Sequence, residues 1–309
     1  MRFWIKLSVS IVCLGWVFLV TPWSEVLECL QGVHMPVFLG AVGVFVLAVI
    51  VWCWNWIFLA RAYGVKEGVL SMLSLSFLGA FVNNMVPGAL FGDRLRGYAL
   101  GARSGDIVRS WAATMLERFI SVISIFAVTL ILLAIGGRGL AKCAVQLPFI
   151  LFLIMIIAVP AAFFVFLSEV KAWLGRDWFT EIILSSVILP KRKQNFFKSL
   201  FFGPLMIAVE GTAILLVSQS LGLEAPYMIY YIFAGMLHLL RVFPVCYSLF
   251  GLQDLIFVLL LPLTGMSAPE AFALSIMVHI ARVISTFPGI FFMKVLNEKL
   301  GPVPEGVKE

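Results

Sequence analysis

The sequence predicts an all-α, polytopic helical membrane protein with about six full spans, two broken re-entrant hairpins and an inverted repeat. Of its 309 residues, 62% are hydrophobic and only 12% are charged, and its mean hydropathy is +1.08. Soluble domains are about half apolar and about a quarter charged, so a soluble fold could not bury this much apolar surface. Backbone groups in lipid must pair within their own segment, which makes helices the expected elements.

Six apolar runs are each long enough to cross a bilayer as a helix, which takes about 17–25 residues. The first follows Arg2 and Lys6, as in a secretory signal, but no small-x-small cleavage site precedes Pro22. We therefore interpret this run as a membrane helix. The six predicted spans are 5–21, 36–60, 110–135, 145–167, 199–221 and 270–293.

Two further apolar stretches, 69–101 and 227–263, are interrupted at their centres. Proline cannot donate a backbone hydrogen bond and glycine tolerates positive φ, so each stretch is expected to break into two half-helices. A plain bundle of eight or more complete spans stays open as the alternative. The interrupting residues are Asn83, Asn84, Pro87, Gly88 and Gly92 in the first stretch, and Arg241, Pro244, Gly251 and Asp254 in the second.

The distribution of charge in the connections predicts the orientation. The connection 22–35 carries Glu25 and Glu28 but no Lys or Arg, whereas 168–199 carries six basic residues. Because cytoplasmic connections are enriched in Lys and Arg, we expect 168–199 and both termini in the cytoplasm, and a location in the cell (inner) membrane. The net charge of +6 follows this pattern, so membrane lipids and no nucleic acid are the expected partners.

Hairpins that enter from opposite sides would divide the single membrane domain into two inverted units. The first repeat would cover 1–140, the second 141–296, and 297–309 would form a cytoplasmic tail. Arg138 and Lys142 are the only basic residues in the connections that this topology does not place on the cytoplasmic side. Inverted repeats with broken helices near the midplane are a recurring plan of transporters, because two mirrored halves can expose one site to each side in turn.

Polar residues gather in and around the interrupted stretches. A break at Pro87 would free backbone amides at the start of a half-helix, which suit an anion such as a lipid phosphate. The alternative is packing, because Gly88 and Gly92 also satisfy GxxxG. If the break binds an anion, Asp93, Arg94 and Arg96 would line or close the mouth of the hairpin.

Several charged residues lie inside predicted spans, where one charge costs about 2.5–3.5 kcal/mol. Glu210 and Arg282 lie mid-span and are expected to pair, and His279 shares a helical face with Arg282. Static ion pairs that hold helices together are the alternative. The candidate lipid-binding residues are Asn84, Pro87, Gly88, Gly92, Asp93, Arg94, Arg96, Glu117, Arg118, Glu210, Arg241, Asp254, His279 and Arg282. No residue pattern predicts a cofactor, a metal site or a complete catalytic motif.

The first polar motif resembles the signature of the lysylphosphatidylglycerol synthase transmembrane-region family, also called flippase-like membrane proteins. The signature reads N-x-x-(L/V)-P-G-x-x-G-(D/E)-x-x-R-x-Y-x-L, and the matching residues lie in 81–98, with one more residue between Gly88 and Gly92 than the signature has. The second hairpin departs from the family pattern, because most of its glycines and its Arg-Glu pair are missing, with Asp254 in place of the acid. With about 16 residues after the last predicted span, we expect no soluble aminoacyltransferase domain.

The resemblance implies translocation of a polar-headed phospholipid or lipid-linked intermediate between leaflets through a polar groove. Two other classes of function stay open. The protein could be a membrane enzyme, or an accessory subunit of one in lipid or lipid-linked glycan synthesis, with Asp93, Glu117 or Asp254 as acid or base. It could also be a scaffold that binds a membrane or cytoplasmic protein through 168–199. The sequence indicates no oligomeric state.

Overall fold

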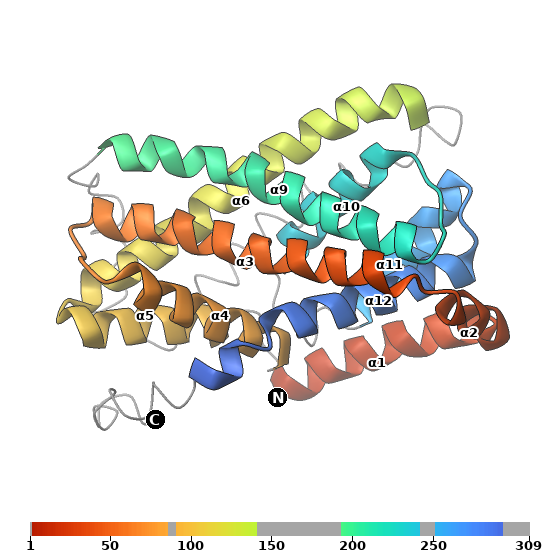
Figure 1. Ribbon diagram of the computed structural model, residues 1–309, viewed down its shortest axis with the longest axis horizontal. Helices are drawn as coiled ribbons and strands as arrows, with labels where there is room; N and C mark the ends of the chain where they lie inside the picture. Colours follow the sequence, from red (N-terminus) through yellow and green to blue (C-terminus); the bar gives the residue numbers. More distant parts are fainter. Residues whose placement is uncertain (1, 86–90, 141–192, 242–250, 293–309) are drawn as a thin grey trace.

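The computed structural model describes residues 2–85, 91–140, 193–241 and 251–292. Every element in these ranges is helical and none is a strand, so the all-α prediction is confirmed (Figure 1). The α-helices are α1 (Arg2–Val20), α2 (Trp23–Gln31), α3 (Met35–Ala62), α4 (Val69–Met85), α5 (Phe91–Ser104), α6 (Ile107–Leu140), α9 (Lys193–Ser220), α10 (Tyr227–Leu240), α11 (Leu252–Leu260) and α12 (Ala268–Thr286), and the 3₁₀-helix η1 covers Leu261–Thr264.

Four helices in the described ranges are long and apolar enough to cross a membrane. They cover Met35–Ala62, Ile107–Ile135, Phe197–Ser220 and Ala268–Phe292. These four coincide with the predicted spans 36–60, 110–135, 199–221 and 270–293. The predicted span 145–167 lies outside the described residues, so the total of six spans stays a prediction.

The first predicted span ends where expected, but the predicted connection 22–35 contains the helix α2. The axes of α1 and α2 meet at 90° across Thr21 and Pro22. Helix α2 forms because its apolar side chains recur at helical spacing and one face packs on α12: Val26 is buried there, and the Trp23 and Phe272 ring centroids lie 5.5 Å apart. The two glutamates made this segment look like a loop in the sequence.

Both interrupted stretches contain two shorter helices, as predicted. Helices α4 and α5 have 17 and 14 residues, or about 25 and 21 Å at 1.5 Å per residue. They run antiparallel, because Gly79 lies against Gly92 and the Arg103 guanidinium donates to Ser71 at 2.5 Å. Helices α10 and α11 meet through the rings of Phe233 and Phe257. Whether the pairs are re-entrant or spanning stays a prediction.

The order of elements also supports two units of similar design. A long helix, a pair of shorter helices and a second long helix occur as α3 to α6 and again as α9 to α12. The further span predicted for the second unit, 145–167, lies outside the described residues. The inverted repeat and its boundaries, 1–140 and 141–296, therefore stay predictions, as does the tail 297–309.

Helix α3 joins the two parts of the apolar core. Its first half, with Phe38 and Phe45, packs in a cluster with residues of α6, α9, α10, α11 and α12. Its second half, with Trp56 and Leu59, packs against α4, α5 and α6. Helix α9 runs beside α3 (Figure 1). Each half of α3 thus lies beside one of two groups of buried charged residues, which are described below.

The close approach of α4 and α5 gives a test of the packing. A Cβ added at Gly92 would collide with the backbone oxygen of Gly79 and approach the Asn83 side chain. We expect Gly92→Ala to lower the free energy of unfolding by about 1–3 kcal/mol through overpacking. Thermal or denaturant unfolding in detergent micelles measures this loss. Gly43→Ala is the control, because a Cβ there meets no described atom within 4 Å, and equal stability of the two variants would contradict the packing.

Candidate functional site

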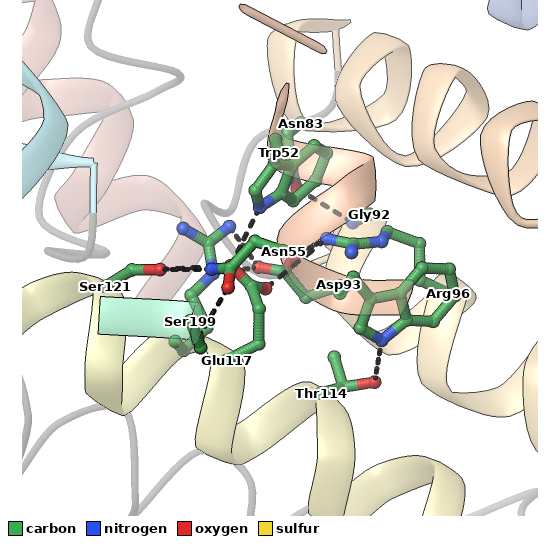
Figure 2. Close-up of polar contacts among 12 residues, drawn as sticks. Trp52, Asn55, Asn83, Gly92, Asp93, Arg96, Thr114, Glu117, Ser121 and Ser199 are labelled. Atoms are coloured by element: carbon green, nitrogen blue, oxygen red, sulfur yellow. Dashed lines mark hydrogen bonds and ion pairs between the residues drawn. The ribbon is translucent and has the colours of Figure 1, made fainter. Parts of the chain in front are cut away.

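Four charged side chains form a first ion cluster, which consists of Asp93, Arg96, Glu117 and Arg118. The Arg96 Nη1 lies 3.3 Å from Asp93 Oδ1 and 3.7 Å from Glu117 Oε2. The Arg118 Nε donates to Asp93 Oδ2 at 2.8 Å, and Arg118 Nη2 also contacts this oxygen. Two carboxylates therefore balance two guanidinium groups at the junction of α5 and α6 (Figure 2).

Two tryptophans from α3 enclose Arg96. Its guanidinium carbon lies 3.7 Å from the Trp52 ring centroid and 4.1 Å from that of Trp56, and the side chain is 0% exposed. Trp52 Nε1 donates to Glu117 Oε1 at 3.1 Å, and Trp56 Nε1 donates to Thr114 at 3.0 Å. Cation–π contacts of this kind are strongest when water is excluded, so the rings stabilise the cation while sealing it from solvent.

Neutral polar groups extend the first ion cluster to a third long helix. Asn55 on α3 donates from Nδ2 to Ser121 on α6 at 3.2 Å, and its Oδ1 accepts from Ser199 on α9 at 2.5 Å. Ser121 in turn donates to Glu117 Oε1 at 3.2 Å. Figure 2 shows these contacts converging from three helices. Buried polar networks with this many partners rigidify their surroundings.

The start of α5 differs from the predicted anion site. The Gly92 amide already donates to Asn83 Oδ1 at 2.8 Å, and Asp93 adds a negative charge in the first turn. This amide is therefore occupied. Pro87 and Gly88 lie outside the described residues.

Two further predicted residues at this end also make contacts. Asn84 donates to Thr286 of α12 at 3.1 Å, which ties the first helix pair to the last helix. The Arg94 guanidinium lies over the Phe91 ring at 5.4 Å.

A second ion cluster, formed by Glu210, His238, Arg241 and Arg282, lies where α9, α10 and α12 meet. Arg241 binds both Glu210 oxygens, at 3.0 and 3.3 Å. Arg282 Nη2 lies 3.7 Å from Glu210 Oε2, and His238 Nδ1 lies 3.7 Å from Oε1. The sequence therefore correctly predicted that Glu210 and Arg282 are partners, and the structure adds two more basic groups to the same carboxylate.

A hydrogen-bonded chain connects this cluster with Asp254 and His279. Arg282 Nη1 donates to Gln253 Oε1 at 2.8 Å, and Gln253 Nε2 donates to Ser275 Oγ at 3.2 Å. Ser275 donates to Asp254 Oδ1 at 2.6 Å, and His279 Nε2 lies 3.5 Å from the same oxygen. The other Asp254 oxygen accepts from the amide of Gly251 at 2.9 Å. Asp254 is thus the partner of His279, while a neutral amide separates it from Arg282.

The two ion clusters differ in how their charges are balanced. In the first, two carboxylates meet two guanidinium groups. In the second, Glu210 is the one carboxylate that the structure places within 4 Å of Arg241 and Arg282 among the described residues. Arg282 Nε and Nη2 form no hydrogen bond within these residues. The second ion cluster therefore has one more cation than its immediate carboxylate can neutralise.

The structure brings the predicted residues into two groups rather than one. Asp93, Arg96, Glu117 and Arg118 form one group, and Glu210, Arg241, Asp254, His279 and Arg282 form the other. Sequence reasoning missed Trp52, Trp56, His238 and Gln253. A Trp pair at i, i+4 beside Asn55 in an apolar span, and a histidine one turn before Arg241, were the available signals.

The balance of the first ion cluster gives a second test. Asp93→Asn leaves two guanidinium groups with one carboxylate, so we expect a loss of about 3–5 kcal/mol of stability. The double variant D93N/R118M restores the charge balance and should recover part of this loss, as measured by denaturant unfolding in micelles. The control is Asp106→Asn, which breaks an exposed ion pair with Arg109 (side chains 36% and 51% exposed) and keeps a helix-capping residue. A D93N protein as stable as D106N would refute the account.

No curated protein matches the chain. The family model described as "Lysylphosphatidylglycerol synthase TM region" matches residues 3–289, which include both ion clusters and all but the last three residues of the four long helices in the described ranges. The protein therefore belongs to the family of the lysylphosphatidylglycerol synthase transmembrane region.

Proposed function

We propose that this protein moves a phosphate-bearing lipid between the leaflets of the cell membrane, and that the second ion cluster receives the phosphate. The family is defined by the membrane region of a lipid-related enzyme, and the helices are apolar enough to span a membrane. We also propose that both termini are cytoplasmic, following the basic connections. The acyl chains stay in lipid while the headgroup passes along the protein, which avoids much of the cost of desolvating it.

The observation that carries the proposal is the excess cation at Glu210. Two guanidinium groups share this carboxylate, and Arg282 Nε and Nη2 lack hydrogen-bond acceptors among the described residues. A buried cation without full compensation is costly. A phosphodiester supplies one negative charge and acceptor oxygens that match a guanidinium fork. The second ion cluster is therefore suited to a monoanionic phosphate.

Access to the second ion cluster is through Arg241. Its side chain is 28% exposed, whereas that of Arg282 is 8% exposed. A phosphate arriving at Arg241 would meet Arg282 only after passing Glu210, which both arginines contact. A lipid headgroup would therefore bind first to Arg241, the outer cation, and then to Arg282, the inner one.

The first ion cluster supports the structure around this route. Its four charges cancel, two indole rings cover Arg96, and Arg96 is fully buried. Both Asp93 and Glu117 are paired with arginine, which disfavours the alternative in which they act as acid and base in a membrane enzyme. The surface proposed for a scaffold, 168–199, falls almost wholly outside the described residues.

Lipid exchange in reconstituted vesicles tests the proposed function. Wild-type protein should accelerate movement of fluorescent, headgroup-labelled phosphatidylglycerol between leaflets, as followed by dithionite quenching. Arg282→Gln should slow this exchange about 10-fold or more, because one charge-assisted hydrogen bond to the phosphate contributes about 1.5–3 kcal/mol. Glu210→Gln should slow it as well, because two arginines without a carboxylate would hold the phosphate too tightly to release it. Arg109→Gln is the matched control, since Arg109 is exposed and lies in neither cluster.

A second lipid separates phosphate recognition from general leakage. Labelled glucosylceramide has a polar headgroup but no phosphate, so the wild-type protein should leave its exchange at the rate of protein-free vesicles. Equal exchange of both lipids, or unchanged exchange in R282Q and E210Q with folding preserved, would reject the role of the second ion cluster.

A further inference from the structure

A histidine also faces the carboxylate that the two arginines share. His238 lies on α10 three residues before Arg241, is buried, and places Nδ1 3.7 Å from Glu210 Oε1. The chain has three histidines, and the proposed lipid route does not use this one. Histidine is the side chain whose charge ordinarily changes between pH 5 and 8.

We propose that His238 binds a proton together with the lipid phosphate, so that one proton is carried with each monoanionic lipid. This inference rests on the proposed function and adds its co-substrate. In the coupled step, the imidazole takes one proton from a hydronium ion and becomes an imidazolium beside Glu210. One O–H bond of the hydronium ion breaks, one N–H bond forms and a water molecule is left, and the reverse transfer to water returns the proton when the lipid leaves.

The charged groups around His238 connect the two binding events. Glu210 faces it from α9, Arg241 from its own helix α10, and Arg118 from α6 adds a further positive field. Arg282 on α12 reaches the same carboxylate. With His238 protonated, three cationic groups share Glu210, and an anion at the arginines relieves their repulsion. Because coupling is reciprocal, a lower pH should tighten phosphate binding, and phosphate binding should draw a proton onto His238.

Coupling of this kind also solves an energetic problem of transport. A monoanionic lipid that crosses alone moves charge through the membrane potential, and the cost rises in proportion to that potential. A lipid that crosses with one proton is electroneutral. A proton gradient could then drive net movement of the lipid.

Proton uptake on binding tests the coupling without transport. Short-chain dihexanoyl phosphatidylglycerol is added to the whole protein in weakly buffered detergent solution containing a pH indicator. Wild type should take up about one proton per bound lipid, because one imidazole accepts one. His238→Gln should lose this uptake, and it should bind the lipid more weakly at low pH than wild type does, with an affinity that no longer depends on pH. His34→Gln is the control, since His34 is exposed and precedes α3 without a side-chain hydrogen bond to the end of this helix, and it should behave like wild type.

Two outcomes would overturn the assignment. Lipid binding by wild type without proton uptake rejects the coupling, and uptake that is lost in His279→Gln but kept in H238Q moves the proton to the Asp254 pair. If H238Q does not fold, the pH dependence of lipid affinity in wild type decides the question. Affinity that rises as the pH falls from 8 to 5 agrees with the proposal, and affinity independent of pH contradicts it.

Vesicle experiments distinguish this inference from the proposed function. Wild-type exchange of labelled phosphatidylglycerol should accelerate in the direction of a proton gradient, and H238Q should lose that response. Exchange that ignores the gradient rejects proton coupling but leaves lipid translocation intact. No exchange under any gradient, despite lipid binding, rejects the proposed function itself.

Discussion

The structure depends on compensating charge where little water is present. Charged residues in membrane segments are costly unless they are paired, and an unpaired one usually has a task. The first ion cluster meets this constraint with equal numbers of carboxylates and guanidinium groups, sealed by Trp52 and Trp56. The second leaves Glu210 between two arginines and a histidine. This difference is the basis of our proposal that the first ion cluster holds helices together and that the second receives a ligand.

The arrangement of the helices makes the second ion cluster possible. Helix α3 provides the ring of Phe45 beside Arg282, while its other half provides the indoles that enclose Arg96. Hydrogen bonds from Asn55 to α6 and α9, and from Asn84 to α12, join the two parts. The proposed movement of a phosphate past Arg241 and Arg282 would then occur beside a cluster whose own charges are balanced.

Much of the architecture could be predicted from the sequence, because apolar length alone identifies a membrane helix. Four spans and the pairing of Glu210 with Arg282 followed from residue positions. The partners of Asp93 could not be predicted in this way. How α5 and α6 are rotated about their axes determines that Arg118 binds Asp93. Trp52 and Trp56 look like ordinary apolar residues of a span, and Gln253 carries no charge. Their roles depend on contacts between helices that spacing along one helix does not reveal.

We propose that the second ion cluster has one more cation than Glu210 neutralises, and that a lipid phosphate neutralises this cation. An experimental structure of the protein in nanodiscs that contain phosphatidylglycerol tests this directly. We expect lipid phosphate density within hydrogen-bonding distance of Arg282 and close to Arg241. Lipid phosphates found only at the rim of the protein, with the arginines closed around Glu210, would disprove the proposal.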